Sequence, residues 1–422
     1  MYRDGWHLLS VHHMSGVSIH GDVMEGYDSL LLGFSRESRF IGCYYSLPYL
    51  KNRILTHGEL SSHLEMAATS LSFATNGSSL PTTSFVSRRV NLSTFVVVED
   101  DSYGEQPYMY VKIYPEYLVI TDTGCNSPRS NDRSLTSLRE YLETYPLPLN
   151  GNQILNPGGK KRYIIICSHC HYDHILGIPQ FISANPIIVA SNFDKSFILE
   201  DLPVHSLCKY IDVPTPKYNI SHWASHLQYL SLAGTPLRVQ FLQIPGHTPC
   251  SLAWYDIDER YLYVGDTFYE RKRHPSMPEL PDDAGQVPGL PATQAAIIFP
   301  EEGGDWIQYM SSLDLLLSFV IFKNDELRRH HDFSHDSIQR VKVAAGHLTY
   351  NADAEHMILQ VRGLFERIIA GKVPVARSGE KRGVIHDFWL ESEDSRFSVM
   401  APRHLAEEAR NHFHPPSEEN DI

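Results

Sequence analysis

Long apolar runs are missing from this sequence of 422 residues. A helix that crosses a membrane needs about 18 or more consecutive apolar residues, and no such run occurs, so no transmembrane segment is expected. The first residues, Met1–Trp6, contain no basic segment followed by an apolar core. We therefore expect no secretory signal, and the predicted location is the cytoplasm.

Positive charge is also scarce, because 36 Lys and Arg face 50 Asp and Glu and give a formal net charge of −14. An acidic chain of this kind is not expected to bind nucleic acid through general electrostatic attraction. A small anionic substrate is still allowed, because a bound cation and a few local basic side chains set the field at a site. The sequence does not predict an oligomeric state.

Cysteines are few, and there are six of them. Without a secretory signal they are expected to be reduced thiols. Cys167 and Cys170 have the C-x-x-C spacing, but no second pair lies nearby to complete a four-cysteine zinc site. A redox role for this pair is not favoured.

Candidate metal ligands are concentrated in one short stretch. His169, His171, Asp173 and His174 directly follow the apolar run Tyr163–Ile166, which predicts a buried strand. In an extended loop His169 and His171 point to the same side, so the pair can bind one ion while Asp173 and His174 bind a second. Imidazole and carboxylate suit Zn²⁺, and also Mn²⁺ or Fe²⁺.

Four more short motifs accompany this stretch. Val119–Gly124 ends in Asp-Thr-Gly, Gln243–Pro249 contains Pro-Gly-His-Thr, Tyr263–Thr267 contains Gly-Asp, and Ala344–His347 ends in Gly-His. Together with the H-x-H-x-D-H stretch they resemble, in order, the motifs of the metallo-β-lactamase superfamily. One six-residue motif can arise by chance, but five in the family's order make a specific resemblance.

This resemblance implies an α/β fold, the metallo-β-lactamase αββα sandwich, in which two mixed sheets are flanked by helices. It implies two Zn²⁺ ions, with Mn or Fe as alternatives. The implied ligands are His169, His171 and His247 for the first ion, Asp173, His174 and His347 for the second, and Asp266 as a bridge between them. Asp122 is expected to support the metal loop through hydrogen bonds without touching a metal.

The implied activity is hydrolysis of a carboxylic derivative by a hydroxide that bridges the two ions. Water between two Zn²⁺ ions loses its proton near neutral pH. Asp173 is expected to orient this nucleophile or to accept its proton, which makes it the predicted catalytic residue.

A thioester, either acyl-CoA or a glutathione thioester, is the favoured substrate. This preference follows a looser resemblance of Thr349–Asn351 to glyoxalase II and of Phe397–Arg403 to metallo-β-lactamase-domain thioesterases. A lactonase, or another ester or amide hydrolase of the superfamily, is the alternative, and a non-catalytic zinc-fold protein is a third. The basic cluster Arg271–Arg273 is either a solvated charge run or the group that meets an anionic substrate.

The chain is predicted to have three parts. Residues 1–65 show no sustained hydrophobic period and are predicted to be disordered or not part of the enzyme. Residues 66–410 are predicted to form the hydrolase domain, with a Pro/Gly-rich insertion at 271–304, and residues 411–422 to form a frayed tail.

Hydrophobic periodicity predicts the elements of the hydrolase domain. Strands are expected at 94–98, 108–114, 117–120, 163–166, 186–190, 239–244, 251–255, 261–264 and 341–345. Helices are expected at 132–145, 175–184, 305–322 and 353–370, with Asp132 as the N-cap of the first and Gly371 after the end of the last.

Overall fold

The computed structural model describes residues 80–232, 235–272, 295–329 and 339–415, and three short strands nearer the N-terminus. These strands, β1 (Gly21–Asp22), β2 (Leu30–Leu32) and β3 (Tyr44–Tyr45), form a small sheet of their own. The chain divides into two units, and the second, Pro81–Ile422, contains all the elements that follow. Most of residues 1–65 lies outside the described residues, so the prediction for this segment stays a prediction.

The first large sheet has seven strands in the order β10-β9-β8-β7-β6-β5-β4. Neighbours from β4 to β7 are antiparallel, whereas β7, β8, β9 and β10 are parallel. The apolar residues of β8 are buried, as expected for a parallel strand that is covered on both faces. The bounds are β4 Phe85–Arg89, β5 Thr94–Glu99, β6 Tyr108–Ile113, β7 Tyr117–Thr121, β8 Arg162–Ile166, β9 Ile187–Ser191 and β10 His222–Ala224.

The second large sheet has six strands in the order β11-β12-β13-β14-β16-β17, of which only β14 and β16 pair in parallel. A third, four-stranded sheet with the order β15-β20-β19-β18 was not predicted from the sequence. The bounds in the second sheet are β11 Tyr229–Leu232, β12 Thr235–Gln243, β13 Leu252–Asp256, β14 Tyr261–Tyr263, β16 Lys342–Ala344 and β17 Ala352–Asp353. Those in the third are β15 Ile297–Ile298, β18 Val375–Lys381, β19 Val384–Trp389 and β20 Val399–Pro402.

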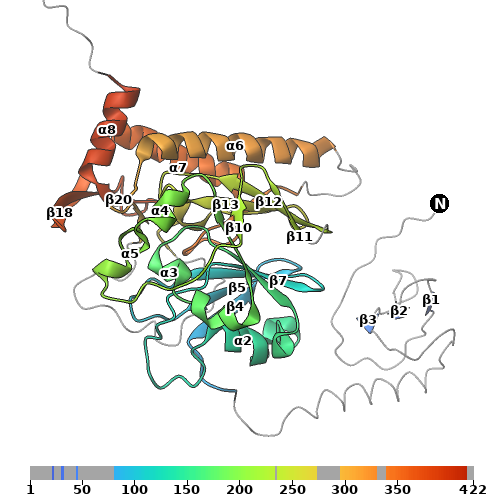
Figure 1. Ribbon diagram of the computed structural model, residues 1–422. Coiled ribbons are helices and arrows are strands. Elements are labelled where there is room, and N and C mark those ends of the chain that lie inside the picture. The colour runs from blue at the N-terminus through green and yellow to red at the C-terminus, as the bar shows by residue number, and fades with distance from the viewer. Residues whose placement is uncertain are drawn as a thin grey trace, which may run out of the picture. The chain divides into compact units, whose positions relative to one another are not determined.

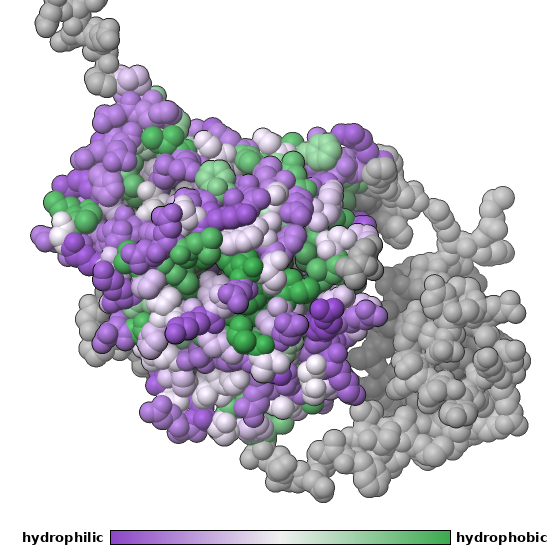
Figure 2. Space-filling model, in the orientation of Figure 1, coloured by the Kyte–Doolittle hydropathy of each residue, from purple (hydrophilic) through white to green (hydrophobic). Residues whose placement is uncertain are grey.

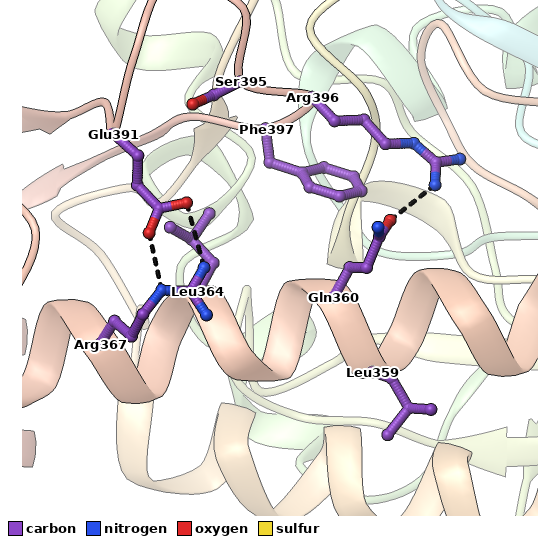
Figure 3. A pocket seen from close by; sticks show the side chains of 8 residues that line it. All are labelled: Leu359, Gln360, Leu364, Arg367, Glu391, Ser395, Arg396 and Phe397. Atoms are coloured by element: carbon purple, nitrogen blue, oxygen red, sulfur yellow. Dashed lines mark hydrogen bonds and ion pairs between the residues drawn. The ribbon is translucent and has the colours of Figure 1, made fainter.

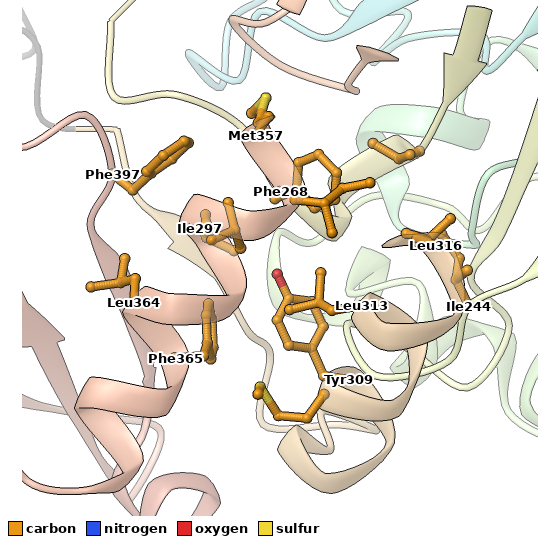
Figure 4. Packing of buried hydrophobic residues seen from close by; sticks show 14 of the residues in the cluster. Ile244, Phe268, Ile297, Tyr309, Leu313, Leu316, Met357, Leu364, Phe365 and Phe397 are labelled. Carbon is orange, nitrogen blue, oxygen red and sulfur yellow. The ribbon is translucent and has the colours of Figure 1, made fainter. Parts of the chain in front are cut away.

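The two large sheets pack against each other around buried side chains that include Ile164 of β8, Phe241 of β12 and Trp254 of β13. Helix α2 (Leu138–Thr144) packs on the outer face of the first sheet. Helices α6 (Trp306–Arg329), α7 (Ala354–Ile369) and α8 (Arg403–Phe413) pack outside the second sheet (Figure 1). Figure 4 shows Tyr309 and Leu313 of α6 close to Phe365 of α7. The predicted αββα sandwich is confirmed.

Shorter helical segments connect the strands. They are η1 Pro148–Asn150, η2 Pro157–Gly159, α3 Tyr172–Ile175, η3 Ile178–Ala184, α4 Lys195–Leu199, α5 Leu202–His205, η4 Cys208–Tyr210 and η5 Gly265–Thr267. Among the described residues, no helix is both long enough and apolar enough to cross a membrane.

The helix predicted at 305–322 continues to Arg329, and two other predicted helices differ more strongly from the structure. The first begins at Leu138, and its N-cap is Ser137, whose hydroxyl accepts from the Glu140 N–H at 3.3 Å. Asp132 is not the cap, because Ser137 is extended and Leu135 pairs with Thr83.

The helix predicted at 175–184 is instead two pieces, α3 and the 3₁₀ segment η3. A Cβ on Gly177, between the two pieces, would lie 2.1 Å from the carbonyl oxygen of Thr123. Pro179, which follows at the start of η3, has no N–H to donate. This break lets the chain pass close to the end of β7.

Candidate metal centre

The predicted ligands lie together at one edge of the sandwich, on loops that follow strands of both large sheets. His169, His171 and His247 form one buried group, and Asp173, His174, Asp266 and His347 form a second. Within each group the candidate donor atoms all lie within 4.8 Å of one another. The ring centroids of His169 and His174 are 4.2 Å apart, so the two groups are adjacent. Metal binding by these residues stays a prediction, and the distances between their donor atoms are compatible with two metal ions.

The second group is organised around two carboxylates. Asp173 Oδ2 lies 3.0 Å from His174 Nε2 and 3.2 Å from His347 Nε2. Asp266 Oδ1 lies 3.3 Å from His174 Nε2, and its Oδ2 lies 3.2 Å from His347 Nε2. In the first group, His247 Nε2 is 3.2 Å from His171 Nδ1. Donor atoms from different loops therefore converge on two small volumes.

Hydrogen bonds fix which nitrogen of several imidazoles faces these volumes. The Nδ1 atoms of His174, His247 and His347 each lie 2.9 Å from an acceptor oxygen, on Asp122, Ile298 and Glu105 respectively. Carbonyl and carboxylate oxygens only accept, so each Nδ1 carries the hydrogen and each Nε2 is directed inward.

Several of these buried atoms have no hydrogen bond to the rest of the protein. Among the described residues, the Nε2 atoms of His169 and His171 are buried without a hydrogen bond, and His174 Nε2 and Asp266 Oδ1 face other candidate ligands. Buried polar atoms are rarely left unpaired unless an ion or a water molecule completes them. Histidine nitrogens and carboxylate oxygens are ligands that zinc and iron accept, so the donor set fits a divalent cation.

Asp122 belongs to neither group and holds the loop that carries the first ligands. Its Oδ1 accepts from the Ser168 N–H at 2.8 Å, and its Oδ2 accepts from Ser168 Oγ at 2.7 Å as well as from His174. The backbone at Asp122 has a φ of +62°, a conformation that Asp adopts more readily than most residues. These contacts support the predicted role of Asp122.

The two groups differ electrostatically. Burial lowers the pKa of His169 and His247 below the ordinary value, and it lowers that of His171 to about 3, so the first group is neutral. In the second group, burial opposes the charge on His174 and His347, but the nearby carboxylates outweigh it and raise the pKa of both imidazoles. A divalent cation would replace these protons, as metal ligation requires.

The glycine of the last motif allows a close approach. A Cβ on Gly346 would lie 2.2 Å from Asp266 Oδ1 and 2.9 Å from the His174 ring. Only glycine leaves room here for the Asp266 carboxylate and the His174 ring.

Sequence reasoning missed three residues beside the site. The Glu105 and Ile298 carbonyls orient His347 and His247, and the Tyr269 ring packs edge-on against His347 with centroids 5.2 Å apart. Tyr269 could have been suspected from the sequence, because it follows the candidate ligand Asp266 by three residues. The two carbonyls could not, because every residue has a backbone carbonyl.

Within the basic cluster at 271–273, Arg271 does not have the position that the anionic-substrate hypothesis required. Arg271 is buried, and its guanidinium donates to the carbonyls of Glu393 and Ser395 at 2.9 and 3.1 Å. It therefore fastens the C-terminal segment, and the hypothesis for Arg271 is wrong. Lys272 is exposed, and residues 273–294 lie outside the described residues.

Comparison with known proteins found one family model and one curated relative. A model of the metallo-beta-lactamase superfamily matches residues 103–320. A protein of Aspergillus versicolor, which bears the provisional name transcription factor avaE, is 30% identical over 343 residues, or 78% of this chain and 89% of that protein.

Two solved structures resemble the chain with TM-scores of 0.40 and 0.39. A metallo-beta-lactamase from Pontibacter korlensis is 12% identical, with 66% of this chain and 98% of that chain covered and a TM-score of 0.40. A metallo-beta-lactamase family protein of Thermus thermophilus is 15% identical, with 68% and 84% covered and a TM-score of 0.39. Because the superfamily model matches about half of the chain, the chain belongs to the metallo-beta-lactamase superfamily.

Proposed function

We propose that this chain is a dinuclear metal hydrolase, with zinc as the favoured metal and manganese or iron as alternatives. The observation that best supports this function is the convergence of seven buried His and Asp side chains into two adjoining groups. Asp266 is suited to bridge the groups, because it faces His174 and His347, and the His174 ring lies beside the His169 ring of the first group. When bound, two divalent ions would lower the pKa of a water molecule and polarise a substrate carbonyl.

Asp173 is the residue we propose for proton handling. Its Oδ2 faces both His174 and His347, and its side chain is buried with them. Asp173 can therefore orient a water molecule beside these imidazoles and hold the proton that this water loses.

A thioester is the substrate that we favour. Water adds to the carbonyl carbon, the carbon–sulfur bond breaks, and the thiolate leaves and takes up a proton, which gives a carboxylic acid and a thiol. This choice depends on the sequence resemblance to glyoxalase II and to thioesterases of the superfamily, and a lactone is the alternative. With Arg271 buried, Lys272 is the one described residue of the basic cluster that could meet an anionic substrate.

The test begins with metal-free protein reloaded with Zn²⁺, Mn²⁺ or Fe²⁺ and assayed against acyl-CoA, S-lactoylglutathione, a lactone and a β-lactam. We expect close to two ions per chain and turnover of a thioester. Asp173→Asn should lower turnover steeply and change thermal stability little. Asp132→Asn is the control, because Asp132 is an exposed carboxylate outside both groups.

Two results would contradict the proposal. Binding of one ion or fewer after careful reloading would exclude the dinuclear centre. Wild-type turnover by Asp173→Asn would exclude the role of Asp173. Because the Aspergillus relative is named as a transcription factor, binding to duplex DNA should be measured with the same preparations, and we expect none from a chain with a net charge of −14.

A further inference from the structure

The third sheet of the structure contacts the metal centre through a hydrogen bond. The carbonyl oxygen of Ile298, in β15, accepts the Nδ1 hydrogen of His247 at 2.9 Å. Such a contact selects the tautomer and the ring orientation of a metal-binding histidine, and losing an outer partner of this kind commonly costs roughly 10- to 100-fold in metal affinity. The position of Ile298 therefore matters for the first group.

The C-terminal part of the chain determines that position. Strand β15 pairs in parallel with β20, through Ile297 N–H to the Ser398 carbonyl at 2.8 Å and Phe299 N–H to the Met400 carbonyl at 2.9 Å. Ile297 is fully buried, and Figure 4 shows it between Phe397 and Phe365. Hydrogen bonds and packing thus hold the two residues that flank Ile298, while its own carbonyl is left for His247.

The next residues are fastened to the same sheet. Glu301 Oε2 lies 2.9 Å from the guanidinium of Arg382, and its Oε1 lies 3.2 Å from His386 Nε2. Arg382 stands at the turn between β18 and β19, where its guanidinium packs 3.7 Å above the Tyr210 ring. The Tyr210 hydroxyl in turn donates to Glu302. Two successive glutamates therefore join the segment after Ile298 to the β18–β19 hairpin and to η4.

We infer that the third sheet, β15-β20-β19-β18, positions His247 for the first metal ion through the Ile298 carbonyl. This inference rests on the proposed metal-binding function and adds a positioning role for Glu301 and Arg382, which lie outside both groups of predicted ligands. Strands β18, β19 and β20 follow the region 103–320 that the superfamily model matches. The surface over β18 and α8 is mainly polar in Figure 2, which does not suggest an apolar docking face there.

The second group depends on another part of the chain. His347 is oriented by the Glu105 carbonyl, which precedes β6, and the Tyr269 ring packs edge-on against it. Loosening the third sheet should therefore weaken the first ion strongly and the second ion little.

The test compares two arginines of the C-terminal part. Arg382→Ala removes the ion pair to Glu301. Arg367→Ala removes another ion pair of this part of the chain, to Glu391 at 2.6 and 3.0 Å, beside a groove of about 250 Å³ that includes no predicted ligand (Figure 3). Glu301→Gln is the second test variant, because it keeps the shape of the side chain and removes its charge.

Co²⁺ is added stepwise to each metal-free protein, and binding is followed by the absorption of the ion and by titration calorimetry. Arg382→Ala and Glu301→Gln should weaken the first ion by roughly tenfold, with the second ion and the Arg367→Ala protein close to wild type. Unchanged affinity in both test variants, equal weakening in Arg367→Ala, or equal loss of both ions would overturn the inference. Wild-type protein that binds two ions but hydrolyses nothing would contradict the proposed function and leave the positioning role standing.

Discussion

Replacing Asp122 tests the link between the fold and the metal centre most directly. Its carboxylate is buried and accepts three hydrogen bonds, at 2.8, 2.7 and 2.9 Å, from Ser168 N–H, Ser168 Oγ and His174 Nδ1. Hydrogen bonds to a charged group contribute about 1.5–3 kcal/mol each, and they are not additive when they share one carboxylate. Removing the carboxylate also ends the cost of burying it, so we expect Asp122→Ala to lower the free energy of unfolding by about 3–5 kcal/mol.

Asp122→Asn separates the contributions. The amide keeps an acceptor for Ser168 N–H, but it places an N–H₂ donor where Ser168 Oγ and His174 Nδ1 both need an acceptor. The φ of +62° suits Asn, whereas Ala pays about 1 kcal/mol or more there. We therefore expect Asn to destabilise less than Ala, at about 2–3 kcal/mol, and still to weaken the second ion by about 10-fold or more.

The assay is denaturant unfolding of the metal-free proteins, combined with a metal titration of each. Metal-free samples are required because a bound ion adds its own stabilisation. If Asp122→Asn unfolds at the wild-type midpoint and binds the second ion with wild-type affinity, the hydrogen bonds of Asp122 do not support His174, and the reasoning fails.

Three further predictions concern other parts of the domain. Lys112 and Asp256 form a buried ion pair at 2.7 Å, so Lys112→Met should cost about 3–5 kcal/mol in denaturant unfolding, and adding Asp256→Asn should recover part of that loss. Burial alone would raise the pKa of Asp353, but the hydrogen bonds from Arg340 and from the His356 N–H outweigh burial and lower the pKa below 3.8. The stability that Asp353 contributes should be complete above about pH 4 and lost as the pH falls through the lowered value. Thermal melts of Asp353→Asn and wild type should therefore differ at pH 7 and converge in strong acid. Gly346→Ala should abolish binding of the second ion in a titration with little change in helix content, since its Cβ would meet Asp266; unchanged binding would contradict the close approach.

The sequence determined the two-sheet sandwich and the identity of the candidate site. The apolar run of β8 predicts a buried strand by itself, and the candidate ligands lie within a few residues of strand ends. The local pattern and the order of the motifs were therefore sufficient to predict the sandwich and the site. The long helices α6 and α7 were recognised because their apolar residues recur at helical spacing. The bounds of α2 and η3 were wrong, because Thr83 and Thr123, distant in sequence, decide where the chain leaves the helical conformation.

Only the tertiary structure decided the rest. Arg271 looks like a solvated charge in sequence, and it is buried because the carbonyls of Glu393 and Ser395, more than 120 residues away, accept its hydrogens. Strand β18 is exposed along its whole length, so it has no apolar alternation to reveal it. The groups that orient His247 and His347 are backbone carbonyls, which every residue possesses. Which of them meets a histidine depends on how distant segments pack, and that is a property of the fold and not of any local pattern.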